Sequence, residues 1–189
     1  MASRPVVVLD ASQLAQAFAV GDGRDRENIG KGDAVYYDPD RMEDNRIASR
    51  ASVVAELVVA TFLKLDWGAQ VWKREDHEIY RDTPDVGLNV EVRRTRSAQA
   101  PLTVRKRDLQ RKPDRVVVSV FVDSADLTQG QIMGWLPALD AWDQGYKPHY
   151  PDPRNEVRVV PYPFLYPITD FDRLTNYVEL PWLPRLTSA

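Results

Sequence analysis

Apolar residues recur with the period of a helix in one long stretch of the chain, residues 47–65. Their spacing is that of a single buried helical face, so this stretch is predicted to be the longest helix. A shorter helix is predicted where Asp10 and Gln13 stand at the spacing of a capping box; it would run to about residue 18 and end at Gly21. The apolar positions of the long helix are Ile47, Ala51, Val54, Val58, Thr61 or Phe62, and Leu65.

Shorter runs rich in β-branched and aromatic residues predict strands before and after the long helix. The run at 116–122 is apolar almost without interruption, which is typical of a central strand covered on both faces. Residues 20–46 carry glycine and proline without periodicity and are predicted to form a long irregular connection. Short helices are predicted at 106–111 and 137–142. The predicted strands are 6–9, 69–74, 84–96, 102–104, 116–122, 131–136 and 156–160.

The length and composition indicate one domain. The 189 residues are 43% hydrophobic, enough for a globular domain with its own core. The mixed order of helices and strands predicts an α/β or α+β sheet domain. More than half of the prolines lie from Pro148 onward, so the last part of the chain is predicted to be an extended, proline- and aromatic-rich tail that wraps the same domain. We divide the chain into an N-terminal strand, helix and loop (1–46), a core (47–145) and this tail (146–189).

Charge is unevenly distributed along a chain whose formal net charge is −3. Residues 93–115 carry nine basic and two acidic side chains, whereas the rest of the chain carries 16 basic and 26 acidic ones. A concentrated basic segment in an acidic chain suits a polyanion such as a nucleic acid, because phosphates respond to the local potential. An ordinary solvated surface gives the same pattern, and charge alone does not decide between the two.

The composition excludes several classes of site. The chain has no cysteine, which rules out disulfides, thiolate zinc sites and a cysteine nucleophile, and it has only two histidines. The glycines between residues 21 and 32 lack the spacing of a phosphate-binding loop or a dinucleotide fingerprint. No stretch is suited to be a signal peptide or a membrane span, so we expect a cytoplasmic protein without a membrane partner.

Glu56 is the only charged residue in the apolar stretch 53–63 of the long helix. An isolated carboxylate is too costly to bury by accident. Glu56 is therefore expected to pair with a cation, to bind a metal or to reach solvent at the edge of the helical face.

Two further acids stand in the stretch 84–96. If the chain stays extended there, Asp85, Glu91 and Arg93 share one face. A bend or bulge at Gly87 would also bring the two acids together. Carboxylate oxygens are the ligands that Mg²⁺ and Mn²⁺ prefer. This face is therefore either a metal site or ordinary solvated surface.

The order of these features resembles the PD-(D/E)XK nuclease superfamily, in particular phage and actinobacterial members with a strand of the form DVG-x-x-(E/Q)-V-R. The match covers roughly residues 14–165, and its central motif is Pro84-Asp85-Val86-Gly87 followed by Glu91-Val92-Arg93. The resemblance implies a restriction-endonuclease-like core, in which helices flank a central mixed sheet. The other matching residues are Ala55-Glu56, the stretch 114–122, Ile132-Met133-Gly134-Trp135-Leu136, and Val20-Gly21 with Arg24.

The resemblance also implies roles for individual residues. Asp85 and Glu91 would ligate one or two Mg²⁺ or Mn²⁺ ions, with the Val92 carbonyl as a further ligand, and the metal would activate a water. Glu56 would bind the metal directly or through water. Arg93 stands where lysine is usual; because arginine does not lose its proton, it suits a phosphate contact and not a general base.

The implied function is hydrolysis of DNA phosphodiester bonds by a metal-dependent nuclease, in the cytoplasm of a bacterial cell or a phage-infected host. The DNA would be duplex or branched, and a homodimer is one expected form of the protein. The alternative is a catalytically inactive nuclease fold that binds nucleic acid or a protein partner. The basic residues expected to contact DNA are Arg94, Arg96, Arg105, Lys106, Arg107, Arg111, Lys112 and Arg115.

Overall fold

Four strands form a mixed sheet at the centre of the computed structural model, which describes residues 4–29, 44–71, 73–76, 83–106, 109, 113–148 and 156–183. β4 pairs parallel with β2, whereas β5 pairs antiparallel with both β4 and β1. The predicted mixed sheet is therefore confirmed, and β2 lies at an edge of the described sheet. The order across the sheet is β1 (Val6–Val8), β5 (Asp126–Pro137), β4 (Val116–Asp123) and β2 (Val90–Thr95).

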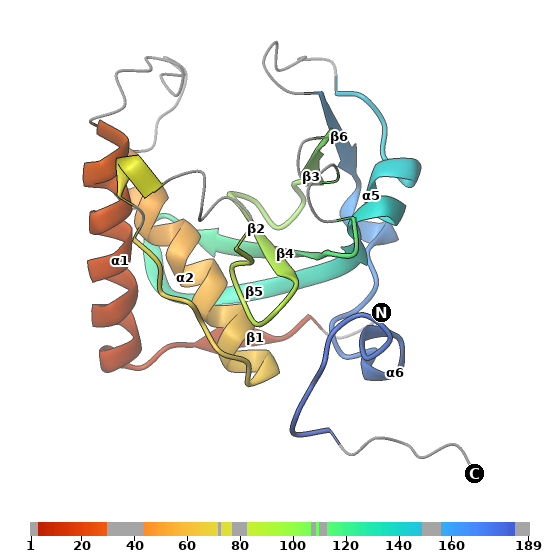
Figure 1. Cartoon of the computed structure of the whole chain (residues 1–189), viewed down its shortest axis with the longest axis horizontal. Coiled ribbons are helices and arrows are strands. Elements are labelled where there is room, and N and C mark those ends of the chain that lie inside the picture. The colour runs from red at the N-terminus through yellow and green to blue at the C-terminus, as the bar shows by residue number, and fades with distance from the viewer. Residues whose placement is uncertain are drawn as a thin grey trace.

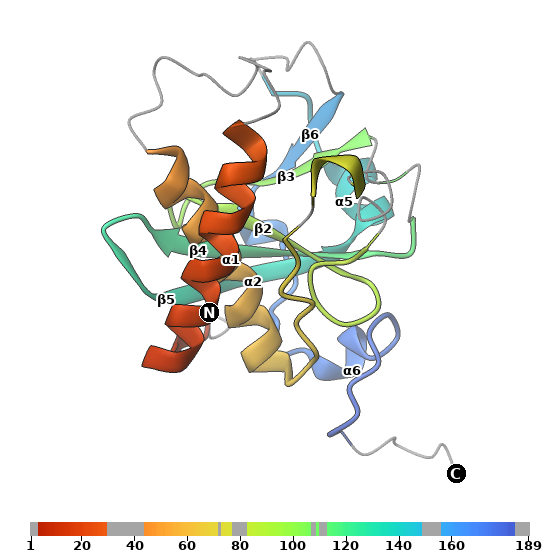
Figure 2. The same ribbon diagram turned by 60° about the vertical axis from the view of Figure 1, so that its left-hand side comes forward.

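Two long helices lie on one face of this sheet. α2 (Asn45–Leu63) packs on the strands, and α1 (Ala11–Ile29) packs on α2 (Figures 1 and 2). α2 begins after Asp44, whose side chain accepts a hydrogen bond from Arg46 N at 2.7 Å, and it ends at Lys64 in the left-handed conformation. The residues of β4 buried against α2 are Val116, Val118, Val120 and Val122.

The opposite face of the sheet carries a smaller layer. β3 (Leu102–Arg105) pairs antiparallel with β6 (Val157–Val160), and α5 (Ala138–Gln144) lies beside this pair (Figure 1). A second apolar core lies between this layer and the sheet, so the sheet has two long helices on one face and a two-stranded sheet with one short helix on the other. The second core contains Leu102, Val104, Val117, Met133, Leu136 and Val160.

Residues 156–183 return across the domain and contribute to both cores. After β6 they form a 3-10 turn, η3 (Tyr162–Phe164), and a short helix, α6 (Phe171–Leu174). The backbones of Trp135 and Tyr166 exchange two hydrogen bonds, at 2.9 and 3.0 Å. The buried apolar residues of this segment are Val159, Val160, Leu165, Ile168, Leu174, Val178 and Leu180.

The first helix continues past its predicted end. Its capping box is present, because Gln13 N donates to Asp10 Oδ1 and Asp10 N donates to Gln13 Oε1, both at 2.9 Å. The prediction that the helix ends at Gly21 is wrong, since Gly21 lies inside α1 at its contact with α2. A Cβ at Gly21 would lie 2.7 Å from Arg50 Cα, closer than real side chains come. The predicted irregular connection is therefore shorter, and residues 30–43 lie outside the described residues.

Two predicted strands also differ from the structure. Residues 69–71 form no strand, and a 3-10 turn, η2 (Arg74–Asp76), follows them, so the strand predicted at 69–74 is wrong in its described part. The strand predicted at 84–96 begins only at Val90, because the chain turns at Gly87, whose φ is 55°. The helix predicted at 106–111 lies largely outside the described residues. The other predicted strands and the helix at 137–142 are confirmed, although β5 begins earlier than expected.

Candidate functional site

Asp85 lies just before β2 begins, at the edge that this strand forms in the described sheet. The turn at Gly87 folds the preceding segment back along the strand. Asp85 Oδ2 then accepts a hydrogen bond from Val92 N at 2.7 Å. Because the N–H and C=O of one strand residue point to the same side, the Val92 carbonyl also faces this edge. The expected bend at Gly87 thus brings Asp85 to the strand that carries Glu91.

Glu91 lies on β2 and is held by two arginines. Arg93 Nη1 donates to Glu91 Oε1 at 2.8 Å, and Arg115 Nη1 donates to Glu91 Oε2 at 2.6 Å. Arg115 comes directly before β4, the parallel neighbour of β2, and only 5% of its surface is exposed. Both oxygens of Glu91 therefore have a cationic partner.

Glu56 projects from the middle of α2 and is also 5% exposed. Arg24 of α1 donates to both of its oxygens, from Nη1 to Oε1 at 2.5 Å and from Nη2 to Oε2 at 3.0 Å. Trp67 Nε1 donates to Glu56 Oε2 at 3.2 Å. The sequence left three partners open for Glu56: a cation, a metal or solvent. In the structure the partner is a cation, the guanidinium of Arg24.

Two glycines of α1 allow Arg24 to reach this position. Gly21 permits the close approach of α1 to α2, and Gly23 permits the close approach of α1 to the segment that follows α2. A Cβ at Gly23 would lie 2.8 Å from Val71 Cγ2. Arg24 Nε donates to Gln70 O of the same segment at 2.8 Å. The backbone of this segment and the Glu56 carboxylate therefore fix the guanidinium from two sides.

The three carboxylates affect one another although they come from distant parts of the chain. Burial raises the pKa of Asp85 well above its ordinary value, and the charges of Glu91 and Glu56 raise it further, whereas the hydrogen bond from Val92 N lowers it. Burial lowers the pKa of Arg24, but the charges of Glu56, Asp85 and Glu91 outweigh this effect and raise it. The site is thus a group of like charges that arginines neutralise.

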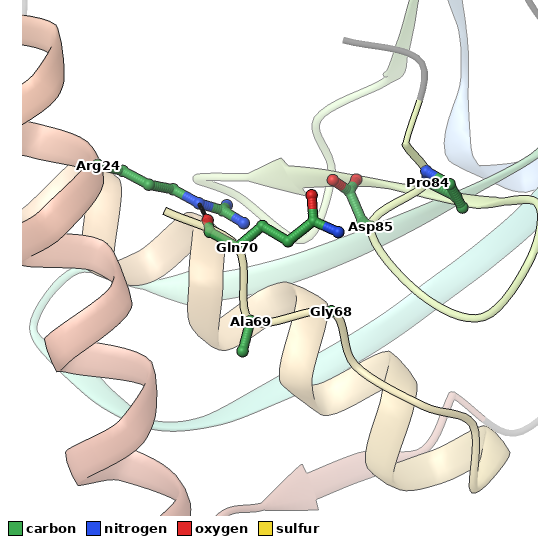
Figure 3. Close-up of a pocket in the computed structure, with 6 residues that line it drawn as sticks. All are labelled: Arg24, Gly68, Ala69, Gln70, Pro84 and Asp85. Carbon is green, nitrogen blue, oxygen red and sulfur yellow. Dashed lines mark hydrogen bonds between the residues drawn. The ribbon is translucent and has the colours of Figure 1, made fainter. Parts of the chain in front are cut away.

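A small depression lies between Arg24 and Asp85 (Figure 3). In Figure 3 the guanidinium and the carboxylate are directed toward one another, with Gln70 between them. The depression has essentially no volume (about 0 Å³) that the centre of a water molecule could occupy. The remaining lining residues are Gly68, Ala69 and Pro84.

The oxygen atoms of the site are of the kinds that bind a hard divalent cation, but the side chains that carry them are not arranged to hold one. Asp85, Glu91 and Glu56 supply carboxylate oxygens, and Val92 supplies a carbonyl; Mg²⁺ and Mn²⁺ accept both kinds of ligand. Within the described parts of the chain, however, no three acidic or histidine side chains are grouped so that they could hold a metal ion. Glu56 and Glu91 are each engaged by arginines, as described above.

The basic residues that we expected to contact DNA have different environments. Arg96 and Lys106 are exposed, and Arg105 is partly buried. Arg94 donates to Val122 O at 3.1 Å and to Ser124 Oγ at 2.8 Å, which ties it to the end of β4. Arg115 is buried against Glu91 and does not join an exposed basic surface. The other three, Arg107, Arg111 and Lys112, lie outside the described residues.

Sequence reasoning identified the three acids and Arg93 but not how they are paired. Arg24 was recognised only as part of a motif, and its pairing with Glu56 was not predicted. A carboxylate in an apolar helix needs a cationic partner, so the sequence indicated that Glu56 has one. It did not indicate which of the basic residues of the chain that partner is. Trp67, which donates to Glu56, was missed altogether.

No known protein family matches the chain, and searches of curated proteins and of solved structures found no similar protein. The described helices include none with the length and hydrophobicity needed to cross a membrane.

Proposed function

We propose that the protein is a metal-dependent nuclease that hydrolyses DNA phosphodiester bonds and has a restriction-endonuclease-like core. The observation that carries this proposal is that Asp85 lies close enough to Glu91 and Glu56 for the charges of both to act on it. Burial next to two other acids raises the pKa of Asp85, which means that the ionised carboxylate destabilises the fold. Unfavourable charge interactions of this kind are typical of functional sites, whereas a site needed only for stability gains nothing from a third acid beside two others.

The surrounding structure supports the same proposal. The helix that carries Glu56 packs on a mixed sheet, and the strand that carries Glu91 lies at the edge of the described sheet. Asp85 and the Val92 carbonyl face that edge. The groups that would hold Mg²⁺ or Mn²⁺ are the carboxylates of Asp85, Glu91 and Glu56 and this carbonyl. Arg93 keeps its proton, so its proposed role is to contact a phosphate.

A second candidate function is nucleic-acid binding without cleavage on the same fold. The arginines paired with Glu56 and Glu91 favour it, because paired acids form a neutral network that needs no metal. The exposed Arg96 and Lys106 serve either function through contacts with phosphates. Cleavage distinguishes the two candidates.

The test is incubation of the purified protein with linear, circular and single-stranded DNA in Mn²⁺ or Mg²⁺, with EDTA as the metal-free arm. The informative variant is Asp85→Asn, because an amide oxygen can still accept the hydrogen bond from Val92 N and the arginine pairs of Glu56 and Glu91 stay intact. Asp143→Asn, on the exposed side of α5, is the matched control.

The proposal predicts cleavage by the wild type and by Asp143→Asn in the presence of metal, and none by Asp85→Asn or in EDTA. If the wild type binds DNA with steep salt dependence but cleaves none of the substrates, the nuclease proposal is wrong and the second candidate function is favoured. Cleavage by Asp85→Asn at the wild-type rate contradicts the assignment of the site. Arg93→Lys restores the lysine of the resembling family, and faster cleavage by this variant would identify arginine as the limit on the rate.

A further inference from the structure

The strand β1 forms the edge of the described sheet that lies opposite β2 (Figure 1). Pro5 O accepts a hydrogen bond from β5 at 3.0 Å, and Leu9 N donates one to β5 at 2.9 Å. Because backbone groups alternate in direction along a strand, the N–H and C=O groups of Val6 and Val8 point away from β5. Among the described residues these groups have no backbone partner.

The side chains of β1 do not protect this edge. Val7 packs on the core beneath the helices, so Val6 and Val8 point to the opposite face of the sheet, where they are 53% and 68% exposed. Edge strands are commonly protected by a lysine, or by a proline whose missing N–H lies on the open side. Here the strand is three valines, and Pro5 faces β5. The edge of β1 is therefore suited to pair with a further strand.

The chain around β1 is complementary to itself in one register. If two copies pair antiparallel with Val7 opposite Val7, then Val6 lies opposite Val8 of the second copy, and each such pair exchanges both N–H···O=C bonds. The same register brings Arg4 near Asp10 of the second copy, on the same face as Val6 and Val8. The two residues carry opposite charges, and the contact occurs twice because the pairing is symmetric. Backbone groups, apolar side chains and charges thus favour the same register.

We propose that the protein forms a homodimer in which the β1 strands of two copies pair antiparallel across a two-fold axis and join the two sheets into one. This inference does not depend on the proposed function. The charged groups are placed for such a contact, because Asp10 is exposed and the Arg4 guanidinium lies over the Tyr162 ring, 4.5 Å from its centre. A strand of three residues buries less surface than a standard interface. The dimer is therefore expected to be weak, with a dissociation constant roughly in the micromolar range.

The experiment is sedimentation velocity of the wild type and four variants over a wide range of protein concentration, with folding checked by circular dichroism. Val8→Pro removes an N–H that points away from β5, whereas its matched control Val8→Thr keeps this donor and a β-branched side chain. Arg4→Glu places like charges opposite one another at Asp10, and Arg26→Glu makes the same change of charge at an exposed position of α1. Val8→Pro and Arg4→Glu are each expected to weaken the dimer by about tenfold or more. Both controls are expected to match the wild type.

A wild type that stays monomeric at every concentration overturns the inference. A dimer in which Val8→Pro associates as tightly as Val8→Thr also overturns it, because the copies then meet through another surface. If Val8→Pro does not fold, the comparison of Arg4→Glu with Arg26→Glu decides: weaker association of Arg4→Glu supports the pairing of β1, and equal association overturns it.

Discussion

Replacement of Glu91 by glutamine is predicted to destabilise the fold because it leaves a buried arginine without its charged partner. The Arg115 side chain is 6% exposed and that of Glu91 is 13% exposed, and their nearest atoms are 2.6 Å apart. Glu91→Gln removes the negative charge but keeps the size of the side chain. The positive charge of Arg115 then stays buried without the negative charge of Glu91 beside it.

The structure allows an estimate of the size of this effect. Charge centres about 4 Å apart attract by about 4 kcal/mol at an effective dielectric constant of about 20. In the wild type this attraction offsets desolvation of the two ions, whereas in Glu91→Gln the Glu91 charge no longer contributes to offsetting the desolvation of Arg115. Breaking a buried pair in this way typically costs about 3–5 kcal/mol. For a chain of this size that corresponds to a fall in Tm of roughly 6–20 °C.

The measurement is urea unfolding, followed by tryptophan fluorescence and far-ultraviolet circular dichroism. Trp135 is fully buried and therefore reports on loss of the core. The double variant Glu91→Gln, Arg115→Met removes both charges and is predicted to be more stable than Glu91→Gln alone. Asp85→Asn is the control, because it neutralises a neighbouring acid without breaking the pair of Glu91 with Arg115.

A loss of less than about 1 kcal/mol in Glu91→Gln would refute this reasoning, because that is the range of exposed ion pairs. A double variant no more stable than the single one would refute it as well. If the prediction holds, substitutions of Glu91 reduce folding and activity together. Asp85 is then the better position at which to test catalysis.

Two further predictions concern Asp85 and Gly21. Because the pKa of folded Asp85 lies above the ordinary value of 3.8, ionisation of Asp85 opposes folding, and the wild type regains stability as the pH falls through the folded pKa toward 3.8. In EDTA at neutral pH, Asp85→Asn is therefore expected to unfold at a higher urea concentration than the wild type. This difference in urea concentration is expected to vanish below pH 3.8, and a difference that stays constant with pH would contradict the raised pKa. Gly21→Ala gains about 1 kcal/mol of helix propensity, but its Cβ would meet Arg50 Cα at 2.7 Å, and overpacking of this kind costs about 1–3 kcal/mol. A lower Tm is expected, and a higher Tm would show that α1 moves away from α2 without cost.

Local patterns predicted the elements whose signals lie within a few residues of one another. The capping box of Asp10 and Gln13 has the predicted reciprocal hydrogen bonds, and the apolar run at 116–122 is a central strand buried on both faces. The end of the first helix was predicted wrongly because glycine is a weak helix former, whereas here the close approach of α2 requires the glycine at position 21. Such a contact is a property of the tertiary structure and has no local signal.

The candidate site shows the same limit. The sequence singled out Glu56 as an acid that needs a partner, but Arg24 is 32 positions away and no local rule selects it. Arg115 was assigned to a basic surface because it belongs to a basic segment, yet the parallel pairing of β2 and β4 places it beside Glu91 and buries it. Charge counts along a sequence do not distinguish a solvated arginine from one that neutralises a buried acid.

The most direct test of the proposed carboxylate centre is a crystal structure of the protein in saturating Mn²⁺, with an anomalous difference map to locate the ion. The proposed centre predicts a Mn²⁺ peak beside Asp85 and Glu91, with Arg24 no longer paired with Glu56. A map without such a peak, with Arg24 still bound to Glu56, would contradict the metal centre and would favour a nucleic-acid-binding protein that does not cleave.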